Sequence, residues 1–390
     1  MTGVAVLGAT GSVGLSTLSV IRRHPARFRV VAMSGHRSVG KLERLAAEFG
    51  TRELAVAESS ALKDRPDLKA AGWRTGPEGV VELAALPGVD VVVNAVVGAA
   101  GLPPTLAALE ADKRCALANK ESLVAAGDLV LEAARRGGGE LVPVDSEHSA
   151  ILQCIGAARR DEINRVILTA SGGPFRETDA EALGEATASM ALRHPTWEMG
   201  AKITIDSATL ANKALEVIEA HFLYGLPYDR IEVVVHPTSI VHSFVEFVDG
   251  SVLSQMGAPT MELPVLHALT WPRRPPDPVL QGFDPIELSP LVFEPVDEKR
   301  FPLFRLGVNA GRAGGAAPAV FNAANEVAVE AFLTGGVTFF GMAEVVAAVL
   351  EALEGRTACD LQEVLQVDRT ARRCAAAEVK RIGAWQSWPQ

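Results

Sequence analysis

Carboxylate side chains occur in this sequence at spacings that suggest chemistry as well as solubility. Asp145 and Glu147 stand two residues apart after a short apolar run, and in an extended segment both side chains would point to the same side. Two neighbouring carboxylates repel each other unless a cation lies between them. Acidic residues are also common at the start of a helix, so the pair alone does not decide between a metal site and a helix cap.

A third carboxylate, Glu216, is predicted to lie on a helix over Ser207–Leu223 that Asp206 caps. Asn212 and Lys213 precede Glu216 by four and three residues, so the three side chains share one face of that helix. A surface ion pair between Lys213 and Glu216 would contribute well under about 1 kcal/mol. In the alternative interpretation Glu216 completes a site of three carboxylates, which suits magnesium or manganese rather than zinc. The polar neighbours would then bind a phosphate: Ser207, Asn212 and Lys213.

Glycines follow the first predicted strand, Val4–Leu7, at the spacing G-x-x-G-x-x-G that runs from Gly8 to Gly14. The turn opens a predicted helix, Ser12–Arg23. Glycines there let backbone N–H groups approach a pyrophosphate at the helix N-terminus, where the helix dipole favours anions. Strand, turn and helix in this order predict a dinucleotide-binding site. A glycine-rich turn that binds nothing is the alternative.

The end of the second predicted strand, Arg29–Met33, selects the nicotinamide cofactor. NAD-binding proteins place an acid there to bind the ribose hydroxyls, but here the strand leads into His36, Arg37 and Ser38 without an acid. Arg37 can bind a 2′-phosphate through charge-assisted hydrogen bonds. We therefore expect NADP(H) to be preferred, and a solvated pair of loop residues is the alternative for His36 and Arg37.

Two further segments contain residue types that bind anions or close a site. Ser171-Gly172-Gly173 follows a predicted strand and is a candidate anion cradle. The segment His194–Lys202 lies in a long polar connection and contains Trp197, which suggests a lid that excludes water from a reacting centre. Ordinary packing of Trp197 against a domain face would explain the same residue.

Composition excludes several classes of function. Acidic residues outnumber basic ones by 47 to 37, and the net charge of −10 with a pI near 5.4 disfavours nucleic-acid binding. The four cysteines form neither a disulfide framework nor a short-spaced zinc-binding pair. The start of the sequence does not match a signal peptide, and no apolar run is long enough for a membrane span. We expect a cytoplasmic enzyme with a small-molecule substrate and without nucleic-acid or membrane partners.

The order of apolar runs and helical segments predicts an α/β fold in several parts. Residues 1–149 alternate Val-rich strands with helices, which indicates a Rossmann-like domain with a parallel sheet. Residues 150–272 contain the hairpin signal Asp249-Gly250, so we expect an α/β catalytic domain with a mixed sheet. A proline-rich linker over 273–301 precedes a small all-helical C-terminal domain over 302–390. The predicted strands are Val4–Leu7, Arg29–Met33, Glu53–Val56, Val89–Val93, Lys113–Ala118, Glu140–Val144, Glu162–Thr169, Ile231–Val235, Val241–Val248 and Val252–Met256.

Taken together, these motifs resemble the 1-deoxy-D-xylulose 5-phosphate reductoisomerase family, which forms 2-C-methyl-D-erythritol 4-phosphate in non-mevalonate isoprenoid synthesis. The resemblance departs modestly from the family pattern: Val13 stands where Ile is common, and His36-Arg37-Ser38 replaces a Gly-x-Asn neighbourhood. It runs through nearly the whole chain, in blocks of which several are rare outside the family: Gly8–Gly14, Ala118–Val124, Pro143–His148, Ser171–Phe175, His194–Lys202, Asp206–Glu216, His236–His242 and Asn322–Val329.

The resemblance implies roles for individual residues. It implies a divalent metal (Mg²⁺, Mn²⁺ or Co²⁺) held by Asp145, Glu147 and Glu216. The substrate phosphate would be bound by Ser171, Ser207, Asn212 and Lys213, with His194 beside it. The rest of the substrate would contact Lys120, Ser146, Glu147, Glu216 and Trp197, and His236 would belong to the active site in an unspecified role. NADPH would be bound by Thr10, Gly11, Ser12, Val13, Gly35, His36, Arg37, Ser38, Asn119, Glu121 and Gly200.

The family's reaction gives these residues a chemical purpose. The substrate ketone and a neighbouring hydroxyl would be chelated to the metal, a Lewis acid and template. Retro-aldol and aldol steps would rearrange the skeleton, and the resulting aldehyde would take a hydride from NADPH. Lys120 would stabilise developing oxyanion charge. The family also implies a homodimer, in which the hairpin Val241–Met256 could extend a sheet across a twofold axis.

Two other functions compete with this interpretation. The glycine turn also resembles semialdehyde dehydrogenases, which need a reactive Cys thiolate, but Cys115 and Cys154 are predicted as small core residues. A non-catalytic NADP(H) sensor could keep the nucleotide domain. It would have no use for three carboxylates beside a phosphate site.

Overall fold

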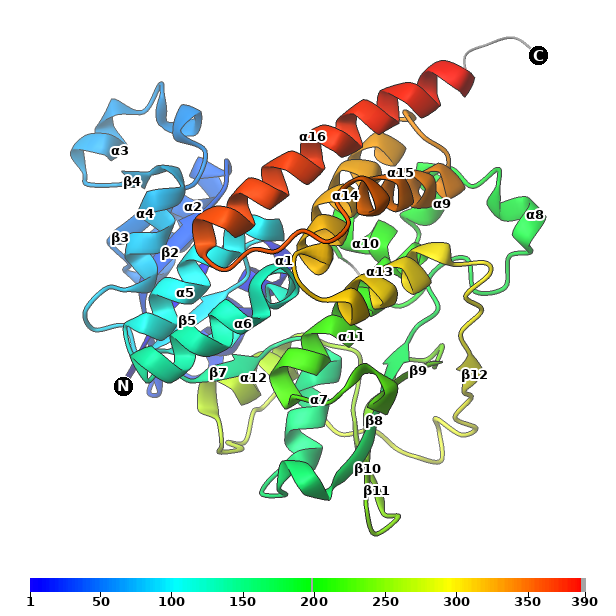
Figure 1. The fold of residues 1–390 in the computed structure, drawn as a ribbon. Helices are drawn as coiled ribbons and strands as arrows, with labels where there is room; N and C mark the ends of the chain where they lie inside the picture. The colour runs from blue at the N-terminus through cyan, green and yellow to red at the C-terminus, as the bar shows by residue number, and fades with distance from the viewer. Residues whose placement is uncertain (198, 387–390) are drawn as a thin grey trace. The chain divides into compact units, whose positions relative to one another are not determined.

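The computed structural model describes residues 1–197 and 199–386 (Figure 1). The chain divides into two compact units. The first unit contains residues 1–122, 128–149 and 260–282, and the second contains the rest of the described chain. Residues 260–282 belong to the first unit although residues of the second precede them in the chain. The four predicted segments stay a prediction of domain organisation. Within the predicted lid, Glu198 lies outside the described residues.

The first unit contains a seven-stranded sheet in the order β4-β3-β2-β1-β5-β6-β7, and all its pairs are parallel. Its central strand β1 is fully buried from Val4 to Leu7, as expected for a parallel sheet covered on both faces. The strand order reverses at β1, and ligands of such sheets bind beyond the carboxyl ends at that point. The strands are β1 Thr2–Leu7, β2 Phe28–Gly35, β3 Glu53–Val56, β4 Arg74–Thr75, β5 Val91–Asn94, β6 Arg114–Leu117 and β7 Leu141–Pro143.

Helices connect these strands, and one of them comes from far along the chain. α12 (Glu262–Thr270) packs against α1, β6 and β7. Asp277 holds the segment after α12, because its carboxylate lies 3.0 Å from Nε of Arg23 and 2.9 Å from Nε2 of His24. The other helices of this part are α1 Ser12–Arg23, α2 Val39–Phe49, η1 Ser59–Leu62, α3 Pro66–Ala70, α4 Gly76–Ala84, η2 Gly98–Gly101 and α5 Leu102–Glu110. α6 Lys120–Gly137 and α7 Ser146–Ile155 contain residues of both units.

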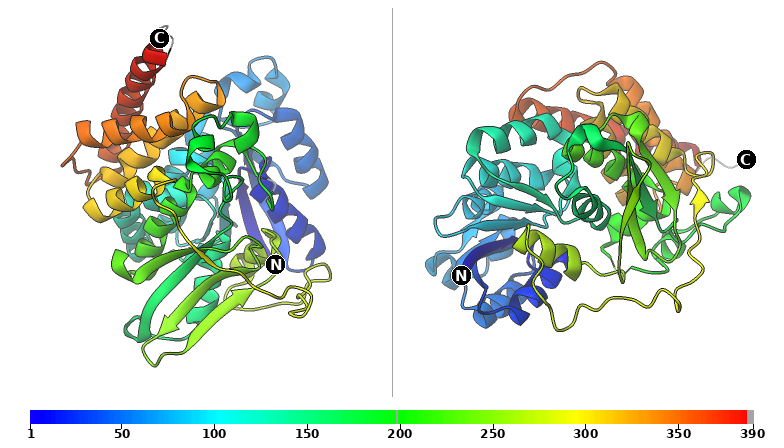
Figure 2. Two further views of the ribbon diagram at one scale, coloured as in Figure 1. Left: turned by 90° about the vertical axis from the view of Figure 1, so that its right-hand side faces the viewer. Right: turned by 90° about the horizontal axis from the view of Figure 1, so that it is seen from below.

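The second unit contains a five-stranded mixed sheet in the order β11-β10-β8-β9-β12 (Figure 2). β8 and β9 are parallel, and the remaining pairs are antiparallel. Gly250, at φ +85°, makes the predicted turn of the β10–β11 hairpin. The strands are β8 Ile163–Ala170, β9 Ile231–Val235, β10 Val241–Phe247, β11 Val252–Met256 and β12 Glu294–Pro295. The last strand lies in the predicted linker and pairs with β9.

The helices of the second unit share one hydrophobic core, in which Phe321 is fully buried. The C-terminal helices pack on one another and on α11, so the predicted all-helical region joins the core beside the mixed sheet. These helices are η3 Arg160–Glu162, α8 Ala180–Leu183, α9 Ala188–Ala191, α10 Ala201–Ala208, α11 Ala211–Tyr224, η4 Tyr228–Arg230, α13 Pro302–Ala313, α14 Ala317–Leu333, α15 Phe339–Ala352 and α16 Leu361–Gln386. In the described part of the chain, we find no helix both long and apolar enough to cross a membrane.

The single helix predicted over Ser207–Leu223 is wrong. Two helices occupy the region, because Leu210 adopts φ +58° between α10 and α11. Thr209 closes α10 by donating its hydroxyl to the carbonyl oxygen of Ile205 at 3.0 Å. Asp206 does not cap a helix but lies inside α10 and is fully buried. The sequence pattern misses this break, since a leucine in the left-handed region leaves no local signal.

Candidate active site

The glycine turn after β1 has the close backbone approach that the sequence predicts. Gly8 has φ +81°, and a Cβ at Gly14 would lie only 2.3 Å from the Gly8 carbonyl oxygen. Gly11 and Ser12 are exposed at the N-terminus of α1, where unpaired N–H groups and the helix dipole favour an anion. The turn therefore fits the pyrophosphate of a dinucleotide.

The end of β2 presents Arg37 to solvent. Its side chain is 71% exposed and lies 3.5 Å from the carboxylate of Glu58, which follows β3. His36 and Ser38 are exposed beside it, whereas Gly35 is buried at the end of the strand. Glu58 was not predicted as a neighbour of Arg37, because only the pairing of β2 with β3 brings the two residues together. A hydrogen bond from the Ser60 hydroxyl is the main cause that lowers the pKa of Glu58.

Asn119 is buried and holds the beginning of α6 in place. Its Oδ1 accepts from the backbone N–H of Ser122 at 3.1 Å. Its Nδ2 donates to the carbonyl oxygen of Gly98 at 2.9 Å and to Oε2 of Glu121 at 2.9 Å. Asn119 thus connects the loop after β5 to the helix that begins with Lys120. The cofactor contacts of Asn119 and Glu121 stay predictions.

Lys120 and Asp145 form a nearly buried ion pair in the first unit. Nζ of Lys120 lies 2.7 Å from Oδ2 of Asp145, and Oδ1 of the same carboxylate lies 3.0 Å from Nδ1 of His148. The predicted extended segment at Asp145 and Glu147 is wrong, because α7 begins at Ser146 and places Glu147 in its first turn. Ser146 donates to Oε2 of Glu147 at 2.6 Å. His148 was not singled out, since its role depends on the helical turn.

Ser171, His194 and Ser207 meet in the second unit, as the resemblance implies. Nε2 of His194 lies 3.0 Å from the Ser171 hydroxyl and 3.1 Å from the Ser207 hydroxyl. Nδ1 of His194 accepts the backbone N–H groups of Thr196 at 3.1 Å and Trp197 at 2.9 Å. An accepting Nδ1 leaves the proton on Nε2, and burial lowers the pKa of His194. The imidazole is therefore a neutral donor between two hydroxyls.

Lys213 and Glu216 are both buried, so the alternative of a surface ion pair is wrong. Lys213 and Asn212 donate to the carboxylate of Glu216. Nζ of Lys213 also donates to the carbonyl oxygen of Thr169 at 2.5 Å. Because Thr169 lies near the end of β8, the lysine reaches the strand that leads into Ser171. A buried lysine–carboxylate pair with further hydrogen bonds is costly to assemble and is common at functional sites.

Backbone contacts hold the loops around this cluster. The guanidinium of Arg300 donates to the carbonyl oxygens of Phe175 at 2.7 Å and Thr178 at 2.5 Å, just after the Ser171–Gly173 turn. Trp197 is partly buried, and Gly200 is exposed as the residue before α10. No local pattern in the sequence singles out Arg300, which acts from more than a hundred residues away.

His236 is fully buried at the end of β9. Its Nδ1 lies 2.8 Å from the carbonyl oxygen of Val292, and its Nε2 lies 3.0 Å from the Thr238 hydroxyl. The ring stacks on Phe293 at 4.6 Å. In this structure His236 thus ties the segment before β12 to the end of β9.

The donor chemistry of the candidate metal ligands fits a hard divalent cation. Asp145 and Glu147 belong to the first unit and Glu216 belongs to the second, and all three offer carboxylate oxygens, which magnesium and manganese prefer. The shared site of the three stays a prediction. Cys115 does not fit a nucleophile, because its complete burial raises the pKa of its thiol to about 12.

A parallel sheet with a glycine turn at its switch point, together with a polar cluster on a mixed sheet, defines an α/β oxidoreductase with a Rossmann-like nucleotide domain. Three family models match the chain: "1-deoxy-D-xylulose 5-phosphate reductoisomerase" over residues 4–127, the C-terminal domain of that enzyme over 141–224, and "DXP reductoisomerase C-terminal domain" over 256–374. The chain belongs to the 1-deoxy-D-xylulose 5-phosphate reductoisomerase family, and the resemblance drawn from the sequence is confirmed.

Individual relatives support the same assignment. The reductoisomerase of Chlorobium chlorochromatii is 49% identical over 96% of this chain and 99% of its own length. The reductoisomerase of Geobacillus sp. is 48% identical over 95% of this chain and 98% of its own length. A crystal structure of a reductoisomerase in complex with NADPH, fosmidomycin and magnesium is 41% identical, with a TM-score of 0.92 over 97% of this chain and 98% of the other. The enzyme of Zymomonas mobilis in complex with NADPH is 43% identical, with a TM-score of 0.89 over 97% and 99%. The predicted fold class and enzyme class are therefore confirmed.

Proposed function

We propose that this protein converts 1-deoxy-D-xylulose 5-phosphate to 2-C-methyl-D-erythritol 4-phosphate with NADPH and a divalent metal (Mg²⁺, Mn²⁺ or Co²⁺). The observation that carries this proposal is the cluster of Ser171, His194 and Ser207 at the end of β8, in the same unit as the buried Lys213 and Glu216. Family membership and the relatives solved with NADPH and magnesium give the same reaction.

The polar cluster of the second unit would bind the phosphate end of the substrate. Ser171 and Ser207 offer hydroxyl donors, and the neutral imidazole of His194 offers its Nε2–H between them. Lys213 and Asn212 add a positive charge and an amide from the start of α11. Hydrogen bonds to a phosphate dianion from such donors are charge-assisted and strong. The turn at Trp197 would then close over the carbon chain and exclude water.

The carboxylates of Asp145, Glu147 and Glu216 would hold the divalent metal. When bound, that metal supplies Lewis-acid polarisation of the substrate ketone. Asp145 is presented by Lys120 and His148, which orient both of its oxygens. Lys120 would bind a substrate oxygen and stabilise negative charge that develops on it. The Ser146 hydroxyl, at the first turn of α7, would give a second hydrogen bond to the substrate.

NADPH would lie at the carboxyl end of β1. The turn from Thr10 to Val13 would receive the pyrophosphate, and Gly35–Ser38 would surround the adenosine ribose with Arg37 on its 2′-phosphate. The nicotinamide end would contact Asn119, Glu121 and Gly200. We also propose a cytoplasmic homodimer, for which the hairpin of β10 and β11 offers an edge strand. The described cysteines give no support to a semialdehyde dehydrogenase, and full activity after thiol alkylation would exclude it.

The substitution Glu216→Gln tests the proposed site. It keeps the size of the side chain and removes the charge that a divalent cation needs, so we expect NADPH oxidation to fall by at least about 100-fold and its metal dependence to disappear. Glu330→Gln, at an exposed position of α14, is the matched control and should behave as wild type. Near-normal activity of Glu216→Gln with unchanged metal dependence would remove Glu216 from the site.

A further inference from the structure

A charged group with no role in the proposed reaction lies fully buried beside the phosphate cluster. The carboxylate of Asp206 is inside α10, directly before Ser207, and has no exposed surface. One oxygen, Oδ1, accepts from Nδ2 of Asn325 at 2.7 Å. The other, Oδ2, lies 2.9 Å from Nζ of Lys202, which stands one turn earlier on α10. Asp206 thereby links α10 to the core helix α14.

This arrangement is expensive for the fold. Taking a carboxylate out of water costs several kcal/mol, and an apolar pair of similar size would often be at least as stable. Asn325 is also fully buried, and its Oδ1 has no hydrogen-bond partner among the described residues. Leaving such a group unsatisfied costs about 1–3 kcal/mol. A polar connection that gives little net stability is best explained by the direction that its hydrogen bonds impose.

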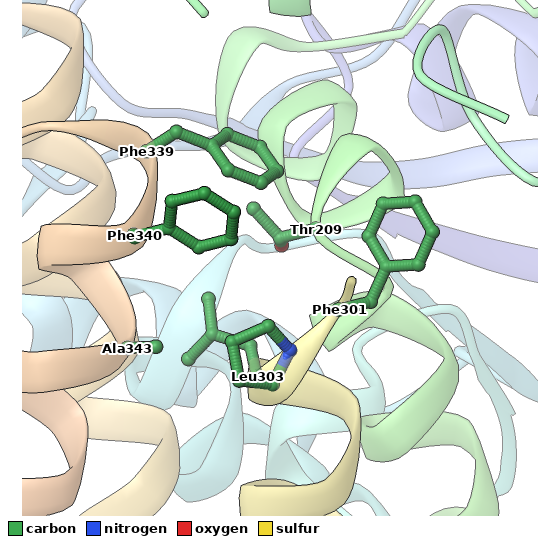
Figure 3. Close-up of a pocket in the computed structure, with 7 residues that line it drawn as sticks. Thr209, Phe301, Leu303, Phe339, Phe340 and Ala343 are labelled. Atoms are coloured by element: carbon green, nitrogen blue, oxygen red, sulfur yellow. The ribbon is translucent and has the colours of Figure 1, made fainter. Parts of the chain in front are cut away.

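Apolar packing also holds the C-terminal end of α10, three residues after Asp206. Thr209, just after the helix, is 2% exposed and lies among Phe301, Phe339 and Phe340 in a small pocket (Figure 3). Such contacts resist removal of the helix from the core but have little directional preference. The Asp206–Asn325 hydrogen bond is directional and acts one residue from the Ser207 hydroxyl. It therefore sets the rotation of α10 about its own axis.

We propose that Lys202, Asp206 and Asn325 form a positioning unit for the phosphate site, in which the buried carboxylate fixes the orientation of Ser207 and of the segment that contains His194. Asp206 touches no substrate in this account and acts through Ser207. Lys202 is also the last residue of the predicted lid segment His194–Lys202, lies in the first turn of α10 and has a side chain that is 20% exposed. The inference rests on the proposed function, since it assumes that Ser207 and His194 bind the phosphate.

The substitution Asp206→Asn tests the positioning role. Misplaced donors weaken binding of the phosphate, so we expect the KM for 1-deoxy-D-xylulose 5-phosphate and the inhibition constant of inorganic phosphate to rise together. The expected rise is about tenfold, which corresponds to about 1.4 kcal/mol. The KM for NADPH should not change, and kcat should change less than KM. Asp179→Asn, an exposed residue before α8 in the same unit, is the matched control.

Two more variants separate positioning from folding. The exchange Asp206→Asn with Asn325→Asp returns one carboxylate and one amide to the core and should bring both constants back toward wild type. Lys202→Gln changes the partly exposed residue of the positioning unit, and it should also raise the KM and the inhibition constant. This variant keeps the test valid even if Asp206→Asn does not fold. A lower unfolding temperature with unchanged constants in Asp206→Asn and Lys202→Gln would overturn the inference and leave a purely structural role.

Ser207→Ala distinguishes failure of this inference from failure of the proposed function. If Ser207→Ala leaves the inhibition constant of inorganic phosphate unchanged, the proposed phosphate site is wrong and the positioning role falls with it. If Ser207→Ala raises that constant while Asp206→Asn and Lys202→Gln do not, only the positioning role is wrong. A higher inhibition constant in all three variants supports both the phosphate site and the positioning role.

Discussion

Nζ of Lys120 lies 2.7 Å from Oδ2 of Asp145, and this pair joins the start of α6 to the residue before α7. The two helices follow β6 and β7, which are neighbours in the parallel sheet. The carboxyl ends of two adjacent strands therefore present a cation and a carboxylate at the same edge. The ammonium of Lys120 therefore orients one oxygen of the Asp145 carboxylate in this structure.

We expect Lys120→Gln to lower kcat by about 10²–10³, because preorganised donors to a developing oxyanion have effects of this size. The dissociation constant of NADPH should stay near that of wild type, since the glycine turn is not touched. Initial rates of NADPH oxidation and a separate NADPH titration check this. Lys63→Gln, at an exposed position, is the control. An unchanged kcat would show that Lys120 serves only to hold Asp145.

Gly14→Ala should damage the nucleotide site more than Gly11→Ala. A Cβ at Gly14 would meet the Gly8 carbonyl oxygen at 2.3 Å, whereas a Cβ at Gly11 would meet it at 3.4 Å, an ordinary contact distance. Overpacking of this kind costs about 1–3 kcal/mol. We expect weaker NADPH binding and a lower unfolding temperature for Gly14→Ala. Equal behaviour of the two variants in calorimetry and NADPH titration would contradict the close approach.

Arg37→Asp should erode the preference for NADPH over NADH. Loss of a charge-assisted hydrogen bond costs about 1.5–3 kcal/mol, and a carboxylate also repels the 2′-phosphate. We expect the ratio of kcat/KM values for the two cofactors to fall by at least about tenfold, which is about 1.4 kcal/mol. Arg44→Asp on the exposed face of α2 controls for net charge. A wild-type enzyme that uses NADH equally well would refute the preference itself.

His194 should make stability depend on pH in the acidic range. Burial lowers its pKa below the ordinary value of 6.5, so at pH below 6.5 the unfolded chain binds more protons than the folded one. The contribution of His194 to the free energy of unfolding is complete above pH 6.5 and is lost as the pH falls toward the lowered pKa. The unfolding temperature of wild type minus that of His194→Asn should therefore be constant above pH 6.5 and fall below it. A difference that stays constant from pH 5 to pH 8 would argue against a neutral, buried His194.

Much of the fold follows from local patterns. The observed bounds of β3, β9 and β11 are those predicted, because short apolar runs between polar turns are strong strand signals. The strands β4 and β12 were missed, since two residues are too few to show the alternation of apolar and polar residues that predicts a strand. Residues 260–282 pack with the first unit through contacts such as that of Arg23 with Asp277, which no local pattern encodes.

The residues of the site that could be predicted from the sequence are those expected to bind a ligand directly. Ser171, His194 and Ser207 were expected together and lie together. Residues that act on other residues were given no role from the sequence: His148 orients Asp145, Arg300 holds the loop after Ser171, and Asn325 binds Asp206. Arg300 and Asn325 lie more than a hundred residues from their partners, and His148 reaches Asp145 only through the first turn of α7, so the folded chain reveals their roles.

The central claim is tested most directly by an assay of the purified protein with NADPH and 1-deoxy-D-xylulose 5-phosphate. Oxidation of NADPH is followed with magnesium or manganese present and after chelation, and the product is identified by nuclear magnetic resonance. We predict oxidation only with metal and substrate together, and a branched product, 2-C-methyl-D-erythritol 4-phosphate. Absence of metal-dependent oxidation, or a product that keeps the unbranched carbon chain, would contradict it.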